Sequence, residues 1–223
     1  MPVKLNSPAF WDREFEKEYK DFCGIGKGNS MVRFAPERFG YIGTFLPIKG
    51  DVLDIGCGIG HLTRFIKAMR PHLRVWGTDC SQVAVRRASE FDKRIKYFYS
   101  KPNKIDIDKK FDVIIASEVL EHIENDEEFL MEIKKYLKPD GVVVLTTPIA
   151  PPGKQKLCSI EHTREYYEVE FNNLLSRFFE NVVVGKPPMK IHPDNHWTVN
   201  AWWQWGVASD KVRLKASQTV IYY

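Results

Sequence analysis

Two carboxylates and an imidazole stand in the stretch SEVLEH (117–122), directly after the apolar run FDVIIA (111–116). An apolar run of this kind is typical of a buried strand, so these groups follow the point where a strand ends. If a helix begins near Ser117, Glu118, Glu121 and His122 are spaced i, i+3 and i+4 and share one helical face. The alternative is a solvated first helical turn, in which the acids only favour the helix dipole.

Two kinds of chemistry fit this cluster. His122 is a candidate general base, held in one tautomer by Glu121, because imidazole titrates near neutral pH. Glu-x-x-Glu-His followed by a later histidine, here His162 in EHTREYY, resembles the metal-binding pattern of the plant small-RNA 2′-O-methyltransferases, and this resemblance implies two carboxylates and two imidazoles that would suit a divalent metal. We therefore expect His122, Glu121 and His162 to be catalytic. A metal held by Glu118, Glu121, His122 and His162 stays an open alternative, and no residue is assigned as a metal ligand.

A glycine-rich turn follows the first predicted strand, in VLDIGCGIG (52–60). Alternating glycines after a strand let a backbone approach a ligand closely, and Asp54 is placed to orient the turn from beneath. The dinucleotide fingerprint G-x-G-x-x-G requires glycine at position 61, where the sequence has His61. Asp79 follows about twenty residues later, at the end of the second predicted strand, where a carboxylate accepts hydrogen bonds from ribose hydroxyls. Capping of the next helix is the alternative role for Asp79.

The elements that position these groups alternate along the chain. Short apolar segments predict strands at DVLDI (51–55), RVWGT (74–78), IKYFY (95–99), FDVIIA (111–116), GVVVLTT (141–147) and ENVVVG (180–185). Helix-like segments separate them, including SQVAVRRASEF, which opens with Ser81 as a predicted N-cap, and EVLEHIENDEEFLMEIKKYL. This alternation predicts an α/β fold with an open, doubly wound sheet.

The two ends of the chain carry less regular patterns. Residues 1–45 contain helical patterns without a strand and predict a helical cap over the carboxyl edge of the sheet. The stretch HPDNHWTVNAWWQW lies in a predicted aromatic-rich insertion, residues 186–215, before a last predicted strand SQTVIYY. Its tryptophans either bind the acceptor or pack as buried structure. We expect one domain, residues 1–223.

Composition excludes several classes. The formal net charge of +4 is spread along the chain, so it gives no nucleic-acid footprint. The four cysteines show no CxxC spacing and no disulfide framework, which is typical of reduced thiols in a cytoplasmic protein. No apolar stretch is long enough to cross a bilayer. The oligomeric state is left open.

Taken together, these motifs resemble the class I S-adenosylmethionine-dependent methyltransferases, in particular the group that contains the ubiquinone-biosynthesis O-methyltransferases. The resemblance rests on VLDIGCGIG, GTDCS (77–81), FDVIIASEVLEHI (111–123) and LKPDGVVVLTTP (137–148), with EHTREYYEVEFNNLL as a later substrate-side segment. It implies a Rossmann-like, doubly wound sheet of seven strands, mostly parallel, with an antiparallel last strand.

The resemblance also implies the cofactor, S-adenosylmethionine, and the residues around it. The expected cofactor-binding residues follow the first four strands: Asp54, Gly56, Cys57, Gly58, Gly60, Asp79, Cys80, Ser100, Ser117 and Glu118. One position departs from the family, which commonly has an acid after the third strand to contact the adenine amino group. Here Ser100 stands in that place, so the resemblance does not say how adenine is held.

The expected reaction is O-methylation of a small-molecule acceptor by in-line methyl transfer. A divalent-metal-dependent RNA 2′-O-methyltransferase is the alternative, although nucleic acid is not the expected partner. A nicotinamide-dependent oxidoreductase conflicts with His61. A binding module without catalysis is the remaining alternative, and the intact glycine turn and Asp79 count against it.

Overall fold

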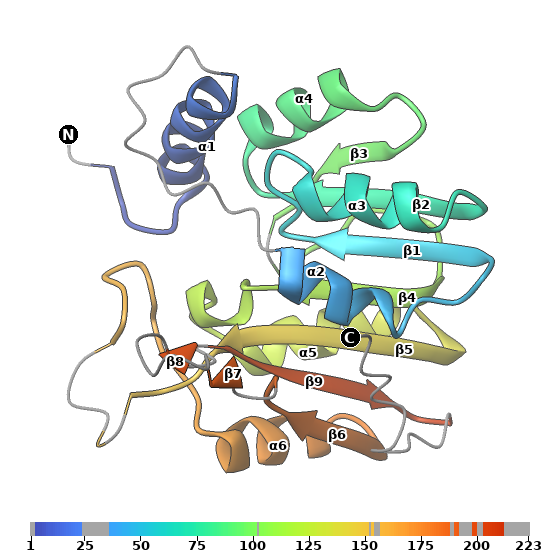
Figure 1. The fold of residues 1–223 in the computed structure, drawn as a ribbon, viewed down its shortest axis with the longest axis vertical. Helices are drawn as coiled ribbons and strands as arrows, with labels where there is room; N and C mark the ends of the chain where they lie inside the picture. The colour runs from blue at the N-terminus through green and yellow to red at the C-terminus, as the bar shows by residue number, and fades with distance from the viewer. Residues whose placement is uncertain are drawn as a thin grey trace.

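The computed structural model describes residues 3–23, 36–101, 103–151, 153, 157–187, 190–191, 198–199 and 203–211. Seven of its strands form one sheet: β1 Gly50–Ile55, β2 Leu73–Asp79, β3 Lys96–Tyr99, β4 Phe111–Ser117, β5 Leu137–Pro148, β6 Asn181–Gly185 and β9 Trp203–Ser209. Their order across the sheet is β3-β2-β1-β4-β5-β9-β6 (Figure 1). A separate two-stranded pair joins β7 Lys190–Ile191 to β8 Thr198–Val199.

The direction of the strands confirms the predicted fold class. β1, β2, β3, β4 and β5 pair in parallel, whereas β9 runs antiparallel to both of its neighbours, β5 and β6. The antiparallel strand is Trp203–Ser209, so part of the expected insertion 186–215 belongs to the central sheet. The strand expected at SQTVIYY lies outside the described residues.

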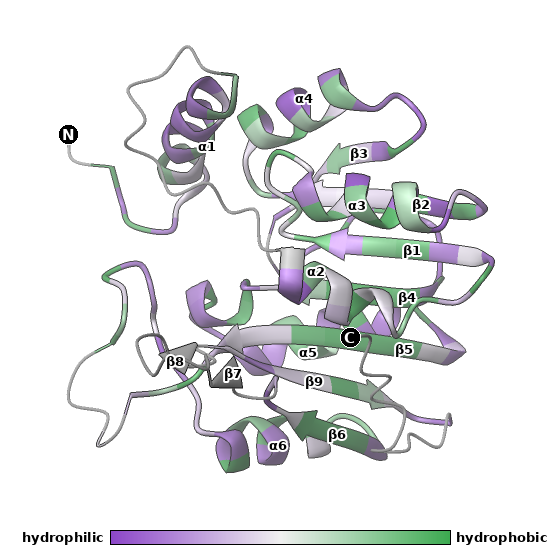
Figure 2. Cartoon of the chain, in the orientation of Figure 1, coloured by the Kyte–Doolittle hydropathy of each residue, from purple (hydrophilic) through white to green (hydrophobic). Residues whose placement is uncertain are grey.

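Helices lie on both faces of this sheet, as parallel strands require. The helices on these faces are α2 Pro36–Gly43, α3 His61–Met69, α4 Gln82–Phe91, α5 Asp126–Lys135 and α6 Glu168–Ser176, whereas α1 Pro8–Phe22 lies at the carboxyl end of the strands (Figure 1). Alternate residues of one strand serve opposite layers: Val52 packs with Ile66 of α3, and Leu53 packs in the cluster that holds Phe129 of α5. Figure 2 shows the apolar character of the central strands between these layers.

The expected helical cap consists of α1 and α2. Ser7 begins α1 by accepting a hydrogen bond from the Phe10 amide at 3.2 Å, which satisfies one free donor of the first turn. The apolar side of α1 packs on Ile59 and on Ala84 of α4, so α1 covers the carboxyl end of the sheet beside the glycine turn (Figure 1).

The segment after β4 corrects one prediction. A single helix from Glu118 onward is wrong: a 3₁₀ turn, Leu120–His122, comes first, and α5 begins only at Asp126. Glu118 has φ of 56°, in the left-handed region that side chains rarely adopt. Glu118, Glu121 and His122 therefore do not share a helical face, and only their position after the strand is as expected.

The described tryptophans of the expected insertion pack in the hydrophobic core. Trp205 is buried, and its ring lies 5.0 Å from that of Tyr41 and 5.8 Å from that of Phe45, centroid to centroid. The part of the aromatic-rich stretch that is described is therefore packing structure and not a binding platform. No helix in the described ranges has the length and apolar character needed to cross a membrane.

A charged network holds the amino end of the sheet. Asp51, at the start of β1, accepts two hydrogen bonds from the Arg74 guanidinium at 2.7 Å, and Lys109 lies 3.1 Å away. Asp112 accepts from the Asp51 amide and from Lys138. Hydrogen bonds from Arg74 hold the pKa of Asp51 well below its usual range despite its burial.

Candidate active site

The turn between β1 and α3 is folded by hydrogen bonds to the next strand. The amides of Gly56 and Cys57 both donate to the carbonyl of Thr78, at 2.8 and 3.0 Å. Gly58 has φ of 53°, and its amide donates to Oδ2 of Asp79 at 2.9 Å. A Cβ atom at Gly58 would lie 2.9 Å from the Phe15 ring of α1, so the turn and the helix above it require glycine here.

Asp54 and Asp79 lie at the carboxyl ends of β1 and β2, close to this turn. Asp79 accepts from Gly58 and, through Oδ1, from the Ser81 amide at 2.9 Å, which fixes the orientation of its carboxylate. Asp54 is fully buried and its Oδ2 has no hydrogen-bond partner among the described residues. Burial and the nearby charge of Asp79 raise the pKa of Asp54 well above its usual range. Asp54 thus offers a ligand a buried oxygen that has no partner among the described residues.

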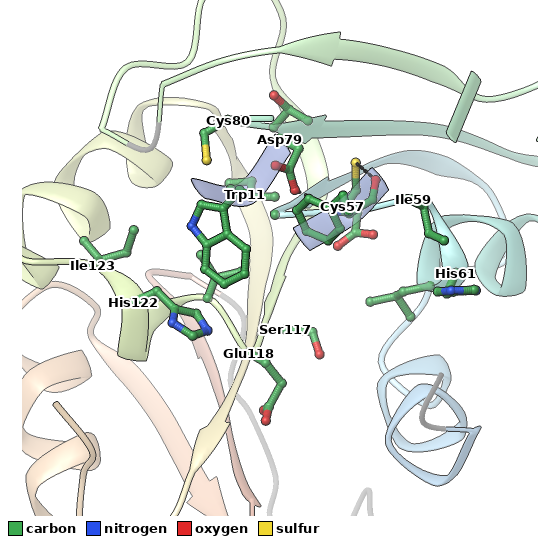
Figure 3. A pocket seen from close by; sticks show the side chains of 18 of the residues that line it. Trp11, Cys57, Ile59, His61, Asp79, Cys80, Ser117, Glu118, His122 and Ile123 are labelled. Carbon is green, nitrogen blue, oxygen red and sulfur yellow. Dashed lines mark hydrogen bonds between the residues drawn. The ribbon is translucent and has the colours of Figure 1, made fainter. Parts of the chain in front are cut away.

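A cavity of about 450 Å³ lies over these carboxyl ends (Figure 3). Most of the predicted site residues line it: Asp54, Gly56, Cys57, Gly58, Asp79, Cys80, Ser100, Ser117, Glu118 and His122. Trp11 and Phe15 of α1 line it from the opposite side. Burial and the charge of Asp79 raise the pKa of Cys80 to about 12, which keeps this thiol protonated and unreactive.

Three predicted residues are not among those that line the cavity. Gly60 has φ of 84° and precedes the first turn of α3. Glu121 is buried behind His122, and its Oε2 accepts from the Thr147 hydroxyl at 3.1 Å. His162 stacks edge-on against His122, with 5.2 Å between ring centroids.

Glu118 occupies the part of the cavity beyond the end of β4. Its Oε1 accepts from the Thr146 hydroxyl at 2.9 Å, and its Oε2 lies 3.2 Å from the Arg38 guanidinium of α2. Desolvation raises the pKa of Glu118, and the charge of Arg38 opposes this rise. Sequence reasoning missed Arg38, because no motif spacing connects a residue of the cap to the end of β4.

His122 is held at both ends of its ring. Nδ1 lies 3.0 Å from the carbonyl oxygen of Glu161, and a carbonyl only accepts, so Nδ1 carries the hydrogen. The neutral ring therefore has its lone pair on Nε2, which lies 3.9 Å from Oε1 of Glu121. The Trp11 ring contacts the imidazole at 5.0 Å between centroids. No local sequence pattern predicts Glu161 as the partner of His122.

His162 has the same arrangement. Its Nδ1 is hydrogen-bonded to the buried carboxylate of Glu165, which leaves Nε2 to face the cluster. Glu121, His122 and His162 each offer one possible ligand atom, and these three atoms all lie within 4.8 Å of one another. Metal-binding histidines usually donate a hydrogen bond from their other ring nitrogen to an oxygen in this way. The i, i+3 spacing of His162 and Glu165 is the sequence signal that could have identified this pair.

The central part of the chain is similar in sequence to known methyltransferases. A family model described as "Methyltransferase domain" matches residues 53–143. The ubiquinone biosynthesis O-methyltransferase of Rickettsia conorii is 33% identical over 103 residues, which cover 44% of this chain and 35% of that protein. This chain therefore matches well under half the length of that relative.

Solved structures agree at the level of the fold. The YcgJ protein of Bacillus subtilis superposes with a TM-score of 0.62 at 17% identity, over 80% of this chain and all of that one. The plantazolicin methyltransferase BpumL, solved with SAH and a desmethyl substrate analog, gives a TM-score of 0.65 at 15% identity, over 92% and 98% of the two chains.

Proposed function

We propose that this chain, which belongs to the class I S-adenosylmethionine-dependent methyltransferases, moves a methyl group from S-adenosylmethionine to a hydroxyl oxygen of a small-molecule acceptor. The observation that carries the proposal is the placement of His122. It lines the same cavity as the glycine turn and Asp79, with Nε2 as its unprotonated ring nitrogen.

The residues around the cavity fit the methyl donor. Asp79 is oriented by Gly58 and Ser81, and a carboxylate there would accept hydrogen bonds from ribose hydroxyls. The buried, unpartnered Oδ2 of Asp54 would accept from a polar group of the donor. A cavity of about 450 Å³ is within the range of small-molecule sites, roughly 300–1,000 Å³.

S-adenosylmethionine supplies a methyl group that is already activated on a sulfonium. The protein therefore has to position the donor and the acceptor and to remove a proton from the acceptor. When bound, S-adenosylmethionine would give this methyl group to the acceptor oxygen and keep the electron pair of the broken carbon–sulfur bond on sulfur. His122 takes the acceptor's proton on Nε2. The imidazolium that results would lie 3.9 Å from Oε1 of Glu121, a group whose pKa is raised well above its usual range by burial and by the charge of Glu118.

The acceptor class follows from the relatives and from the site. The curated relative is named for O-methylation in ubiquinone biosynthesis, which supports a small molecule with a hydroxyl group. Neither the comparisons nor the charge distribution supports RNA as the acceptor. Trp11 and Phe39 give the cavity aromatic walls, which suit a planar acceptor such as a phenol.

The test combines binding and turnover. Calorimetry with S-adenosylhomocysteine measures cofactor binding, and transfer of a labelled methyl group to a panel of phenols and catechols measures activity. His122→Ala should bind the cofactor normally and lose turnover, while His72→Ala, an exposed histidine outside the site, should retain both. Equal turnover in the two variants would contradict the role of His122.

A second candidate is supported by the cluster at Glu121, His122 and His162. Both imidazoles present Nε2 to the cluster with Nδ1 held by an oxygen, an arrangement that suits a divalent cation. A cation there would polarise the acceptor hydroxyl and would make His122 a ligand instead of a base.

Chelation separates the two candidates. With a base at His122, activity should persist in chelator. With a cation, activity should disappear and return on addition of Mn²⁺, Mg²⁺ or Zn²⁺. Metal content measured on the purified protein gives a second readout, and His162→Ala should lower it only if the cluster holds a cation.

A further inference from the structure

The carbonyl oxygen of Glu161 accepts two hydrogen bonds, and both donors belong to residues that line the cavity. One is Nδ1 of His122, at 3.0 Å. The other is Nδ2 of Asn6, at 2.7 Å, across 155 residues of sequence. Asn6, His122 and Glu161 all line the cavity. A single oxygen therefore connects the segment before α1 to the imidazole proposed to act on the acceptor.

A turn before α1 fixes the place of Asn6. Ser7 donates to the Lys4 carbonyl from its amide, at 3.2 Å, and from its hydroxyl, at 2.6 Å, so residues 4–7 form a closed turn. Asn6 has φ of 57°, in the left-handed region that asparagine tolerates better than most side chains. Because Ser7 also caps α1, the direction of the Asn6 side chain is tied to this helix.

The orientation of the Asn6 amide follows from its partner. A carbonyl oxygen only accepts, so the amide turns its NH₂ group to Glu161 and its Oδ1 away. Oδ1 is buried without a hydrogen-bond partner among the described residues, and an unpaired buried oxygen opposes folding. The amide is thus held by its bond to Glu161 at a local cost in stability. Such a cost is typical of a residue that serves a site.

Glu161 is attached from its other side through Thr163. The amide and the hydroxyl of Thr163 both donate to the Glu121 carbonyl, at 2.7 and 2.9 Å. Asn6 adds an attachment on the Glu161 carbonyl itself. The place of this oxygen decides which ring nitrogen of His122 carries the hydrogen, because Nδ1–H needs an acceptor within hydrogen-bonding distance. If the carbonyl moved, His122 would no longer present Nε2 as its unprotonated nitrogen.

We propose that Asn6 is a positioning residue for His122, which it orients through the Glu161 carbonyl. Trp11 of α1 also contacts the imidazole, so the cap holds His122 by one aromatic and one hydrogen-bonded attachment. The cap is therefore part of the geometry of the proposed base as well as a cover over the cavity. The expected effect on turnover rests on the proposed function, whereas the effect on the His122 ring does not.

Two variants separate the amide donor of Asn6 from its backbone conformation. Asn6→Asp keeps the size of the side chain and tolerates the left-handed backbone but cannot donate at neutral pH, and Asn6→Gly removes the side chain. Both should lower kcat by roughly tenfold to a hundredfold, because the base is displaced. The KM for the acceptor and the Kd for S-adenosylhomocysteine should change little. Asn173→Asp, at an exposed position of α6, controls for the added charge and should change none of these values.

The kinetic test has two contrary outcomes. Wild-type kcat in Asn6→Asp would show that the amide donor is not needed. A loss of S-adenosylhomocysteine binding that parallels the loss of kcat in both variants would show that Asn6 only holds the cap in place. Either result would overturn the proposal.

Nitrogen-15 NMR of the imidazole rings gives a readout that does not depend on turnover. Spectra recorded in chelator at alkaline pH, where the rings are neutral, report which nitrogen carries the hydrogen. The His122→Ala spectrum assigns the signal. Wild-type His122 should carry its hydrogen on Nδ1, and Asn6→Asp should populate the other tautomer. A hydrogen on Nε2 in the wild type, or an unchanged signal in Asn6→Asp, contradicts the inference. The expected spectra without methyl transfer to any acceptor would instead overturn the proposed function.

Discussion

Asp12 of α1 accepts a hydrogen bond from the Ser81 hydroxyl at 2.6 Å, across 69 residues of sequence. The same oxygen accepts from the Val83 amide at 3.0 Å, so a side chain of one helix caps the N-terminus of another, α4. Ser81 in turn donates its amide to Asp79. The position of α1 is thereby connected, through one residue, to the acid proposed to hold the ribose.

Removing this cap should weaken both stability and cofactor binding. Asp12→Ala leaves the Ser81 hydroxyl and the Val83 amide without their acceptor and should lower the free energy of unfolding by about 1–2 kcal/mol. Affinity for S-adenosylhomocysteine should fall as well, because Trp11 and Phe15 lose their fixed position over the cavity. Urea denaturation and calorimetry measure the two effects. Arg13→Ala, on the exposed side of the same helix, should change neither.

Gly58→Ala should damage the turn. The substitution places a side chain at φ of 53° and brings its Cβ to 2.9 Å from the Phe15 ring, which should cost roughly 1–3 kcal/mol of stability. Gly40→Ala is the matched control, because it lies in α2 with open space around it and should be neutral or stabilising. Equal unfolding free energies for the two variants, measured in urea, would contradict this account of the turn.

The pH dependence of turnover should identify the base. Nε2 of His122 accepts a proton only while the ring is neutral, so the rate should fall toward acid pH in the wild-type protein. His122→Asn should lower kcat by roughly 10²–10⁴-fold and remove this acidic limb. A variant that keeps the limb would assign it to another group, and steady-state kinetics across pH 5–9 supply the measurement.

Asp51 should contribute stability that is lost in acid. Its pKa is depressed in the folded protein, so the contribution is complete above the unfolded value, near 4, and is lost progressively as the pH falls from there through the lower folded value. Asp51→Asn should cost about 1–3 kcal/mol at pH 7, since Arg74 is largely exposed and screened by solvent. The difference from wild type should shrink at pH 3 in urea denaturation. Asp140→Asn, at an exposed position, should show little effect at either pH.

The central strands were predictable because both faces of each are covered. β1, β4 and β5 are continuous apolar runs, and their order and direction follow from the alternation with helices. β9 was missed because its sequence contains polar residues that are buried, Gln204 and Ser209. Both side chains donate to distant backbone: Gln204 to the Tyr166 carbonyl and Ser209 to that of Gly141. Such partners are invisible in a local pattern.

The site was predictable to the extent that its residues follow strands. The spacing of Asp54, Gly58 and Asp79 places each of them at or just after the carboxyl end of a parallel strand, and all three line one cavity. The backbone conformation of SEVLEH was not predictable. Val119 packs against Gly56 of the glycine turn, and the left-handed backbone at Glu118 goes with this long-range contact. Arg38 reaches the site only through the docking of α2.

A single strand, β1, carries the salt-bridged Asp51 at one terminus and the pocket-lining Asp54 at the other. The charged network around Asp51 is thus kept apart from the carboxyl end of the strand, which lines the cavity. Laboratory evolution of new acceptors can therefore vary the loops at one rim of the sheet while the opposite rim preserves the fold.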